Sequence, residues 1–327
     1  MTTDLLIFAL GESRSFGDSV GRALGVLPSE HEERDFEDGE HKARPLVNVR
    51  DQDVFVIHSL YGEPGRSVND KLCRLLFFLA TIQDAGARRV TAVAPYLCYS
   101  RKDSRTKTRD PVTTRYVAAL FEAVGVDRVV TLDVHNPAAY QNAFRCRTEL
   151  LEARSILVGR LRDHLKEGPV SVVSPDVGGV KRADRFREAL ARSVEADVAS
   201  AFMYKRRSEG VVTGEVLVGR VEEGTAVIID DLVSTGTTMR RAAQACRDAG
   251  AREVIAVATH GLFLEESAGV VEDPAIDRFL VTNTVPPFRL DPDLVRRKVE
   301  IVDATPRVAE AIQRMHEGGS VAELNEA

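Results

Sequence analysis

The residues best suited to chemistry lie in one stretch, AVIIDDLVSTGTTMRRAA, at positions 226–243. Its four leading apolar residues predict a strand buried on both faces, and Asp230 and Asp231 follow at the end of that strand. A turn of small residues then opens a helix that stops at Gly250: Ser234, Thr235, Gly236, Thr237 and Thr238. Because unpaired backbone N–H groups and the positive end of a helix dipole point at such a turn, the pattern predicts an anion site.

The two adjacent carboxylates would repel an anion. We therefore expect Asp230 and Asp231 to face sugar hydroxyls or a divalent cation. The alternative is an ordinary capped helix after a strand, because Ser and Thr are also good N-cap residues.

Further polar stretches follow predicted strands, which is where ligands bind in open α/β sheets. Residues 36–40 (FEDGE) form an acidic turn that carries one aromatic side chain. Residues 101–109 (RKDSRTKTR) include five basic residues, which suit polyphosphate. On sequence alone, each stretch more often forms only a solvated loop.

Three more candidates complete the set. His135 suits a metal or a phosphate, although a structural histidine fits as well. Asp176 precedes a glycine pair and suits a metal or a sugar hydroxyl. The basic run 205–207 leads into SEGVVTG, which predicts a mobile loop able to close over a phosphoryl group, or else an exposed basic hairpin. Together these groups favour phosphoryl or diphosphoryl transfer.

Composition bounds the class of protein. The 327 residues suit two domains, and 44% apolar with 29% charged residues indicates a globular chain without a membrane span. A net charge of −6 argues against a general nucleic-acid binder. The four cysteines include no CxxC pair, and the first residues predict a strand rather than a signal peptide, so we expect a cytoplasmic protein.

Short apolar runs alternate with amphipathic stretches, which predicts an α/β fold with a largely parallel sheet. The expected strands are 5–10, 54–60, 89–94, 129–134, 170–174, 226–229, 254–258 and 279–282. The expected helices are 16–24, 68–84, 111–124, 149–165, 180–193, 239–249 and 306–315. Asp110-Pro111, Asn136-Pro137 and Thr305-Pro306 each place a capping residue before a proline at the first helical position.

One internal echo bears on domain organisation. QDAGARRVTAVA (83–94) and RDAGAREVIAVA (247–258) agree at most positions, and each combines a helix end, a glycine and a buried strand. Two similar helix-to-strand crossings would explain this, but so would a duplicated α/β domain. The duplication predicts one domain over 1–150 and a second over 151–327.

Neither common nucleotide fingerprint is present, because the chain contains no GxxxxGKS or GxxxxGKT loop and no GxGxxG after a strand. The chain instead resembles the ribose-phosphate pyrophosphokinases, the enzymes that make phosphoribosyl pyrophosphate (PRPP). The resemblance runs through FEDGE, PYLCYSRKD, TLDVH, SPDVGGVKR, YKRR, IIDDLVSTGTT, ATHGLF and VTNTVP, in that order. It implies two similar domains of the type I phosphoribosyltransferase fold, each with a largely parallel sheet flanked by helices.

The resemblance also implies roles for single residues. It assigns ribose hydroxyls to Asp230 and Asp231, and the 5-phosphate to Ser234, Thr235, Gly236, Thr237 and Thr238. It assigns ATP to Phe36, Asp38, Glu40, Arg101, Lys102, Asp103 and His135, with part of the adenine site coming from a neighbouring subunit of a homo-oligomer. It assigns Mg²⁺ to His135 and Asp176, and transition-state stabilisation to Lys205 and Arg207 of a flexible loop.

Three positions depart from the family pattern. Lys102 replaces a common Gln and adds charge beside the expected polyphosphate, and Ser234 replaces an acidic residue. Thr237 replaces a Gly, so we expect a strained turn there.

The implied reaction transfers the diphosphoryl group of Mg·ATP to ribose 5-phosphate, giving PRPP and AMP. Neither nucleic acid nor a membrane is an expected partner. The alternatives are a phosphoribosyltransferase that consumes PRPP and a non-catalytic paralogue that regulates an active partner.

Overall fold

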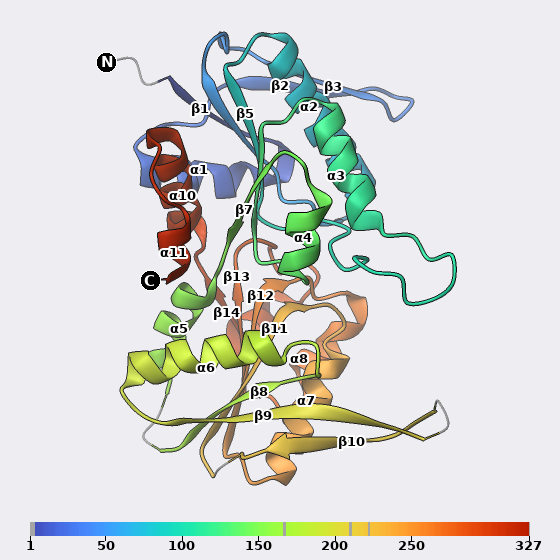
Figure 1. Cartoon of the computed structure of the whole chain (residues 1–327), viewed down its shortest axis with the longest axis vertical. Coiled ribbons are helices and arrows are strands. Elements are labelled where there is room, and N and C mark those ends of the chain that lie inside the picture. Colours follow the sequence, from blue (N-terminus) through green and yellow to red (C-terminus); the bar gives the residue numbers. More distant parts are fainter. Residues whose placement is uncertain (1–3, 166–167, 209–210, 222, 327) are drawn as a thin grey trace. The chain divides into compact units, whose positions relative to one another are not determined.

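The computed structural model describes residues 4–165, 168–208, 211–221 and 223–326, without the side chains of 205–208, 211–215 and 326. It contains two compact units (Figure 1): Met1–Glu152 with Ala304–Ala327, and Ala153–Asp303. The sequence-based division at residue 150 assigned all of 151–327 to the second domain, whereas the structure groups the last helices with the first unit. No helix among the described residues has the length and apolarity that crossing a membrane requires.

The first unit is built on a five-stranded parallel sheet in the order β1-β4-β5-β6-β7. The strands are β1 (Leu5–Ala9), β4 (Asp53–Ile57), β5 (Arg89–Ala94), β6 (Arg128–Leu132) and β7 (Arg147–Leu151). The helices are α1 (Arg14–Leu24), α2 (Val68–Asp84), α3 (Thr113–Ala123), α4 (Pro137–Ala143), α10 (Thr305–Glu317) and α11 (Ala322–Glu326). Strands β2 (His31–Asp35) and β3 (His41–Pro45) form a separate antiparallel hairpin.

Helix α10 packs against α1 and buries Val308, Ile312 and Met315. Polar contacts also hold its end in place. His316 Nδ1 lies 2.8 Å from Oδ2 of the fully buried Asp53, and Arg89 Nη2 donates to the Met315 carbonyl at 3.2 Å. The C-terminal segment is therefore part of the first unit's core.

The second unit has a seven-stranded sheet in the order β10-β9-β8-β11-β12-β13-β14. The strands are β8 (Val170–Ser174), β9 (Val198–Ser208), β10 (Val211–Gly219), β11 (Thr225–Val233), β12 (Glu253–Gly261), β13 (Arg278–Thr282) and β14 (Val299–Val302). The helices are α5 (Arg154–Arg162), α6 (Val180–Val194), α7 (Thr237–Asp248), α8 (Ala268–Val271) and α9 (Pro292–Lys298). Only β10 pairs antiparallel.

The two units repeat one plan, which confirms the prediction of two similar α/β domains. The orders β1-β4-β5-β6-β7 and β8-β11-β12-β13-β14 correspond, with a hairpin inserted after the first strand of each. The sequence echo marks equivalent corners: Val90 N–H donates to Asp127 at 2.7 Å, and Val254 N–H donates to Asp277 at the same distance.

One expected helix and one expected helix cap were wrong. The helix expected over 149–165 is strand β7 followed by α5, because a five-residue edge strand is too short to show a clear alternation. Asp110 does not cap α3, whose N-cap is Val112. Asn136 does cap α4, accepting from Ala139 N–H at 3.2 Å, with Pro137 at the expected position.

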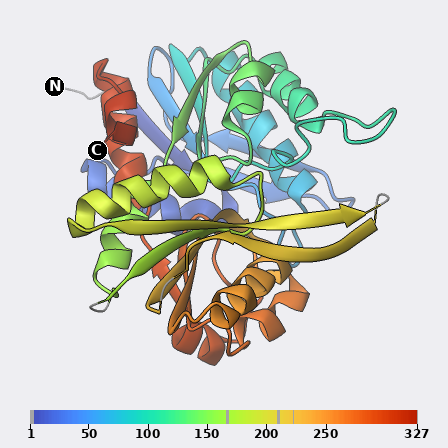
Figure 2. The ribbon, with the colours of Figure 1, turned by 60° about the horizontal axis from the view of Figure 1, so that its bottom comes forward.

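The stretch expected to be a mobile loop after the basic run 205–207 is largely a hairpin. Strands β9 and β10 extend as a long ribbon (Figure 2), and β8 pairs with β9 only as far as Phe202. The β-branched Val211, Val212, Val216 and Val218 favour strand, and a register shift lies between Val212 and Gly214.

Two helical glycines give a test of packing in each unit. A Cβ on Gly17 of α1 would lie 2.2 Å from the Ala9 Cβ of β1, whereas a Cβ on Gly159 of α5 would meet nothing within 4 Å. We expect Gly17→Ala to lower the free energy of unfolding by about 1–3 kcal/mol through overpacking. We expect Gly159→Ala to raise it by about 0.5–1 kcal/mol through helix propensity.

Urea unfolding of both variants would measure these opposite shifts. Equal stabilisation by the two alanines would show that α1 does not rest on β1 as closely as described.

Candidate functional site

The turn after β11 is an open cradle of backbone donors. Gly236, at φ +77°, is the N-cap of α7 and brings no side-chain cap with it. Among the described residues, the N–H groups of positions 235–239 donate to no protein acceptor, and the first such bond at the helix start is Arg240 N–H to the Gly236 carbonyl at 2.9 Å. These donors and the α7 dipole give the anion site predicted from the sequence.

The chain after β12 supports this cradle. Leu262 N–H donates to the Val233 carbonyl at 2.9 Å, and Leu264 N–H donates to the Ser234 carbonyl at 3.0 Å. A Cβ on Gly236 would lie 2.8 Å from Val270 Cγ1, so the turn fits against α8 only with glycine there. Tight packing therefore fixes the backbone that carries the donors.

The expected strain at Thr237 is absent. Thr237 is the first residue of α7, and the left-handed conformation falls on Gly236 instead. The Thr237 hydroxyl lies 3.2 Å from the Thr235 hydroxyl, so the two side chains lie beside the cradle together. Because Thr237 takes a helical conformation, its β-branched side chain is not forced into the left-handed region.

Asp230 and Asp231 share one arginine. Arg182 of α6 places Nη1 at 2.8 Å from Asp230 Oδ1 and Nη2 at 3.1 Å from Asp231 Oδ1. Burial, together with the neighbouring charge of Asp231, raises the pKa of Asp230 well above its usual range, and Arg182 opposes that rise. Sequence reasoning assigned no role to Arg182, although it closes the SPDVGGVKR motif.

Asp176 begins the loop between β8 and α6. Its Oδ1 accepts from Gly179 N–H at 2.9 Å, and its carbonyl accepts from the Ser174 hydroxyl at 2.7 Å. This carboxylate therefore shapes the loop. Among the described residues, no three His, Cys, Asp or Glu side chains gather as they would around a bound metal ion.

In the first unit, Phe36, Asp38 and Glu40 lie in the exposed turn that joins β2 and β3. Phe36 N–H donates to the Glu40 carbonyl at 2.8 Å, and the Arg34 guanidinium lies 5.1 Å from the centre of the Phe36 ring. The residue before the turn, Asp35, forms ion pairs with Arg66 and Arg74. These pairs hold the turn to the body of the unit.

Two other predicted groups meet at the ends of β5 and β6. Asn136, next to the exposed His135, donates from Nδ2 to Asp103 Oδ2 at 2.7 Å. Arg101 is exposed, whereas Lys102 Nζ lies 2.7 Å from Asp110 and lowers the pKa of that carboxyl. In the part of the chain that the structure describes, no hydrogen bond or ion pair joins these residues to the turn at 36–40.

Lys205 and Arg207 lie in β9, where Lys205 pairs in register with Glu215 and Arg207 with Val212. Their side chains fall outside the described part of the structure. The assignment of both to catalysis therefore stays a prediction.

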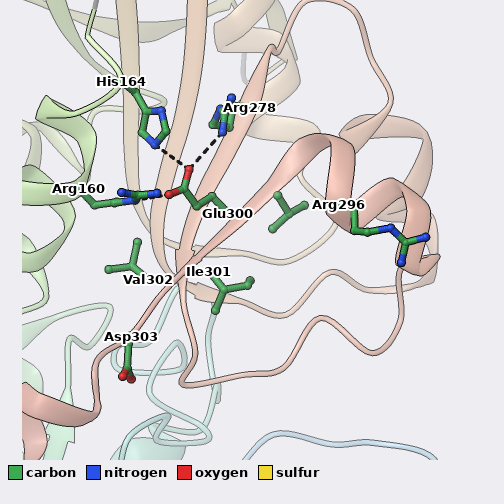
Figure 3. A pocket seen from close by; sticks show the side chains of 9 residues that line it. Arg160, His164, Arg278, Arg296, Glu300, Ile301, Val302 and Asp303 are labelled. Atoms are coloured by element: carbon green, nitrogen blue, oxygen red, sulfur yellow. Dashed lines mark hydrogen bonds and ion pairs between the residues drawn. The ribbon is translucent and has the colours of Figure 1, made fainter.

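A hollow of about 570 Å³ at β14 contains none of these residues (Figure 3). Three of its basic side chains converge on Glu300: His164 Nε2 at 2.7 Å, Arg278 Nη1 at 3.2 Å, and Arg160. Arg296, which also lines the hollow, points away from Glu300. Partial burial raises the pKa of Glu300, but hydrogen bonds from Arg160 and His164 outweigh it and lower the pKa overall. The interactions described in this hollow are ion pairs with Glu300, so we describe it as an ion-pair cluster.

Comparison with known proteins gives a consistent result at both ends of the chain. A model for the N-terminal domain of ribose phosphate pyrophosphokinase matches residues 5–125, and one for the phosphoribosyl synthetase-associated domain matches residues 192–326. Ribose-phosphate pyrophosphokinase 2 of Schizosaccharomyces pombe is 31% identical, covering 99% of this chain and 98% of that protein. The ribose-phosphate pyrophosphokinase of Maricaulis maris is 36% identical, covering 95% and 96%.

A solved structure extends the likeness to the fold. The crystal structure of phosphoribosylpyrophosphate synthetase from Mycobacterium smegmatis matches with a TM-score of 0.86 at 30% identity, covering 96% of this chain and 99% of that one. Identity of 30–36% over nearly the whole length of both proteins indicates membership of one family. The chain therefore belongs to the ribose-phosphate pyrophosphokinase family.

Proposed function

We propose that this protein is a ribose-phosphate diphosphokinase that makes PRPP for nucleotide biosynthesis. The 1-hydroxyl oxygen of ribose 5-phosphate attacks the β-phosphorus of ATP, and a new O–P bond forms. The bond between the β-phosphorus and the α,β-bridging oxygen breaks, AMP leaves, and the hydroxyl proton is released. The observation that carries this proposal is the cradle of unpaired N–H groups beside the Asp230–Asp231 pair, in a member of this family.

The second unit would bind the acceptor. A 5-phosphate suits the donors of positions 235–239 and the hydroxyls of Ser234, Thr235, Thr237 and Thr238, because each N–H and O–H can donate to a phosphate oxygen. Asp230 and Asp231 would accept from ribose hydroxyls. Replacing an acid by Ser234 removes a negative charge from beside the phosphate, which favours this arrangement.

The first unit would bind ATP. We assign adenine and its ribose to Phe36, Asp38 and Glu40, and the phosphates to Arg101, Asp103 and His135. Lys102 forms an ion pair with Asp110, so it adds less positive charge to the nucleotide site than an unpaired lysine would. By the family resemblance, these ATP sites would lie at subunit interfaces of a homo-oligomer, in the cytoplasm.

The residues present fit Mg²⁺ that enters with the nucleotide. Asp176 offers a carboxylate, and Mg²⁺ commonly takes one or two such ligands with waters and substrate phosphates. Imidazole is a poorer match for Mg²⁺, so we favour the phosphates for His135. When bound, the ion would neutralise phosphate charge. Lys205 and Arg207 would stabilise the transferred diphosphoryl group.

Direct measurement of the products tests the reaction itself. Purified protein with Mg²⁺, ATP and ribose 5-phosphate should release AMP and PRPP in equal amounts, measured by chromatography. ADP release would contradict diphosphoryl transfer. Turnover of PRPP with a nucleobase would favour a phosphoribosyltransferase, and no turnover at any inorganic phosphate concentration would favour a regulatory paralogue.

Lys205→Ala tests the assignment of the β9 residues. We expect kcat to fall by about 10²–10³-fold, because charge that stabilises only the transition state is lost, while ribose 5-phosphate affinity changes little. Arg206→Ala, one residue along β9, is the matched control and should keep most of the activity. An equal loss in both variants would indicate damage to the hairpin instead.

Gly236→Ala tests the cradle. The new Cβ meets Val270 and must adopt φ +77°, so the turn should shift and raise the KM for ribose 5-phosphate by about tenfold or more. Gly318→Ala imposes a similar left-handed conformation, φ +80°, with no atom within 4 Å of the new Cβ. Steady-state kinetics should show no KM change in that control. A normal KM in Gly236→Ala would remove the cradle from the binding site.

A further inference from the structure

Arg182 is the cation that the described structure places on the acidic pair. It is the third residue of α6, and its two terminal nitrogens reach one carboxylate each, at 2.8 Å and 3.1 Å. The Asp231 side chain is 4% exposed, so its charge receives little help from water. A planar arginine fork suits this bridging position in a way that a lysine does not.

Gly179 leaves room for the Ser174 side chain beside this arrangement. A Cβ there would lie 2.7 Å from the Ser174 hydroxyl, which donates to the Asp176 carbonyl, and 3.6 Å from Arg182 Nη1, an ordinary contact distance. The guanidinium therefore packs against the loop that follows β8 at normal contact distance. The ion pairs join α6 to β11, two elements far apart in sequence, at the expected sugar-binding carboxylates.

Other titratable groups on the neighbouring elements are already engaged. His260 of β12 is buried, with Nδ1 at 2.8 Å from the Thr284 hydroxyl, and the Asp176 carboxylate accepts from Gly179 N–H. The charges that act on Asp230 are those of Asp231, which opposes its ionisation, and Arg182, which favours it. Even with Arg182 in place, burial and Asp231 raise the pKa of Asp230 to about 7, so loss of Arg182 would move this titration to higher pH.

We propose that Arg182 is a positioning residue for ribose 5-phosphate, orienting Asp230 and Asp231 so that both accept from sugar hydroxyls. The inference rests on the proposed function, because it assumes that this pair meets the sugar. A protonated carboxyl presents a donor where the sugar needs an acceptor. The affinity of a protein without Arg182 should therefore recover only at a higher pH than the affinity of the native protein.

Calorimetric binding of ribose 5-phosphate without nucleotide, between pH 7 and 9, tests this. The range lies above the second phosphate pKa, which is about 6, so ligand titration contributes little. For Arg182→Gln we expect affinity about tenfold or more weaker at pH 7, recovering as pH rises and the shared proton is lost. Arg182→Lys keeps the charge without the fork, so it should bind more weakly than native protein but with the pH profile of the native protein.

Arg187→Gln is the matched control. Arg187 lies on the same helix and pairs with the exposed Asp184 at 2.9 Å, so its loss should leave affinity and pH profile unchanged. Thermal unfolding of each variant verifies folding, and Arg182→Lys carries the test if Arg182→Gln does not fold.

A loss in Arg182→Gln that is equal at every pH, or no loss, would overturn the inference. So would a pH-dependent affinity in Arg182→Lys matching that expected for Arg182→Gln. Failure of the native protein to bind ribose 5-phosphate would instead overturn the proposed function.

Discussion

Parallel strand pairing is the constraint on which both units depend. Every strand of the first sheet and all but β10 of the second run in one direction, so the strand ends of each sheet meet at one edge. The loops that follow β5 and β6 meet for this reason, and Asn136 reaches Asp103 across them. In the second unit the same edge brings Arg182 of α6 to the carboxylates of β11. Residues distant in sequence become neighbours because the loops that carry them all start at the same edge of the sheet.

The two units also show how one plan supports different uses. In the second unit the backbone N–H groups at 235–239, after β11, have no acceptor among the described residues. In the first unit, several N–H groups in the corresponding segment between β4 and α2 donate to acceptors of the protein itself. Before and at the start of α2, Glu63 N–H donates to the Arg66 carbonyl at 2.9 Å, Ser67 N–H to Asp70 Oδ2 at 2.7 Å, and Asp70 N–H to the Ser67 hydroxyl at 3.1 Å. A cradle filled by its own chain cannot hold a phosphate. This difference explains why the acceptor site is expected in one half only.

Local patterns predicted much of the fold. Buried strands such as β5 and the whole span of α2 follow from apolar periodicity. The short edge strand β7 carried too little alternation, and the valines of β10 were obscured by neighbouring glycines and charges. The cradle was predictable because its strand, turn and helix are contiguous. The Arg182 ion pairs were not, because they join residues 48 positions apart, and no local pattern reports such a pairing.

The return of α10 to the first unit has a consequence for synthesis. The ribosome makes residues 1–152 first, yet their core is completed by Val308, Ile312 and Met315, which emerge only after the entire second unit. The surface of α1 that packs against α10 therefore stays exposed while the second unit is translated, and the first unit cannot complete its core until then. Although it comes second in the chain, the unit over 153–303 is the first whose sequence is complete in one uninterrupted piece.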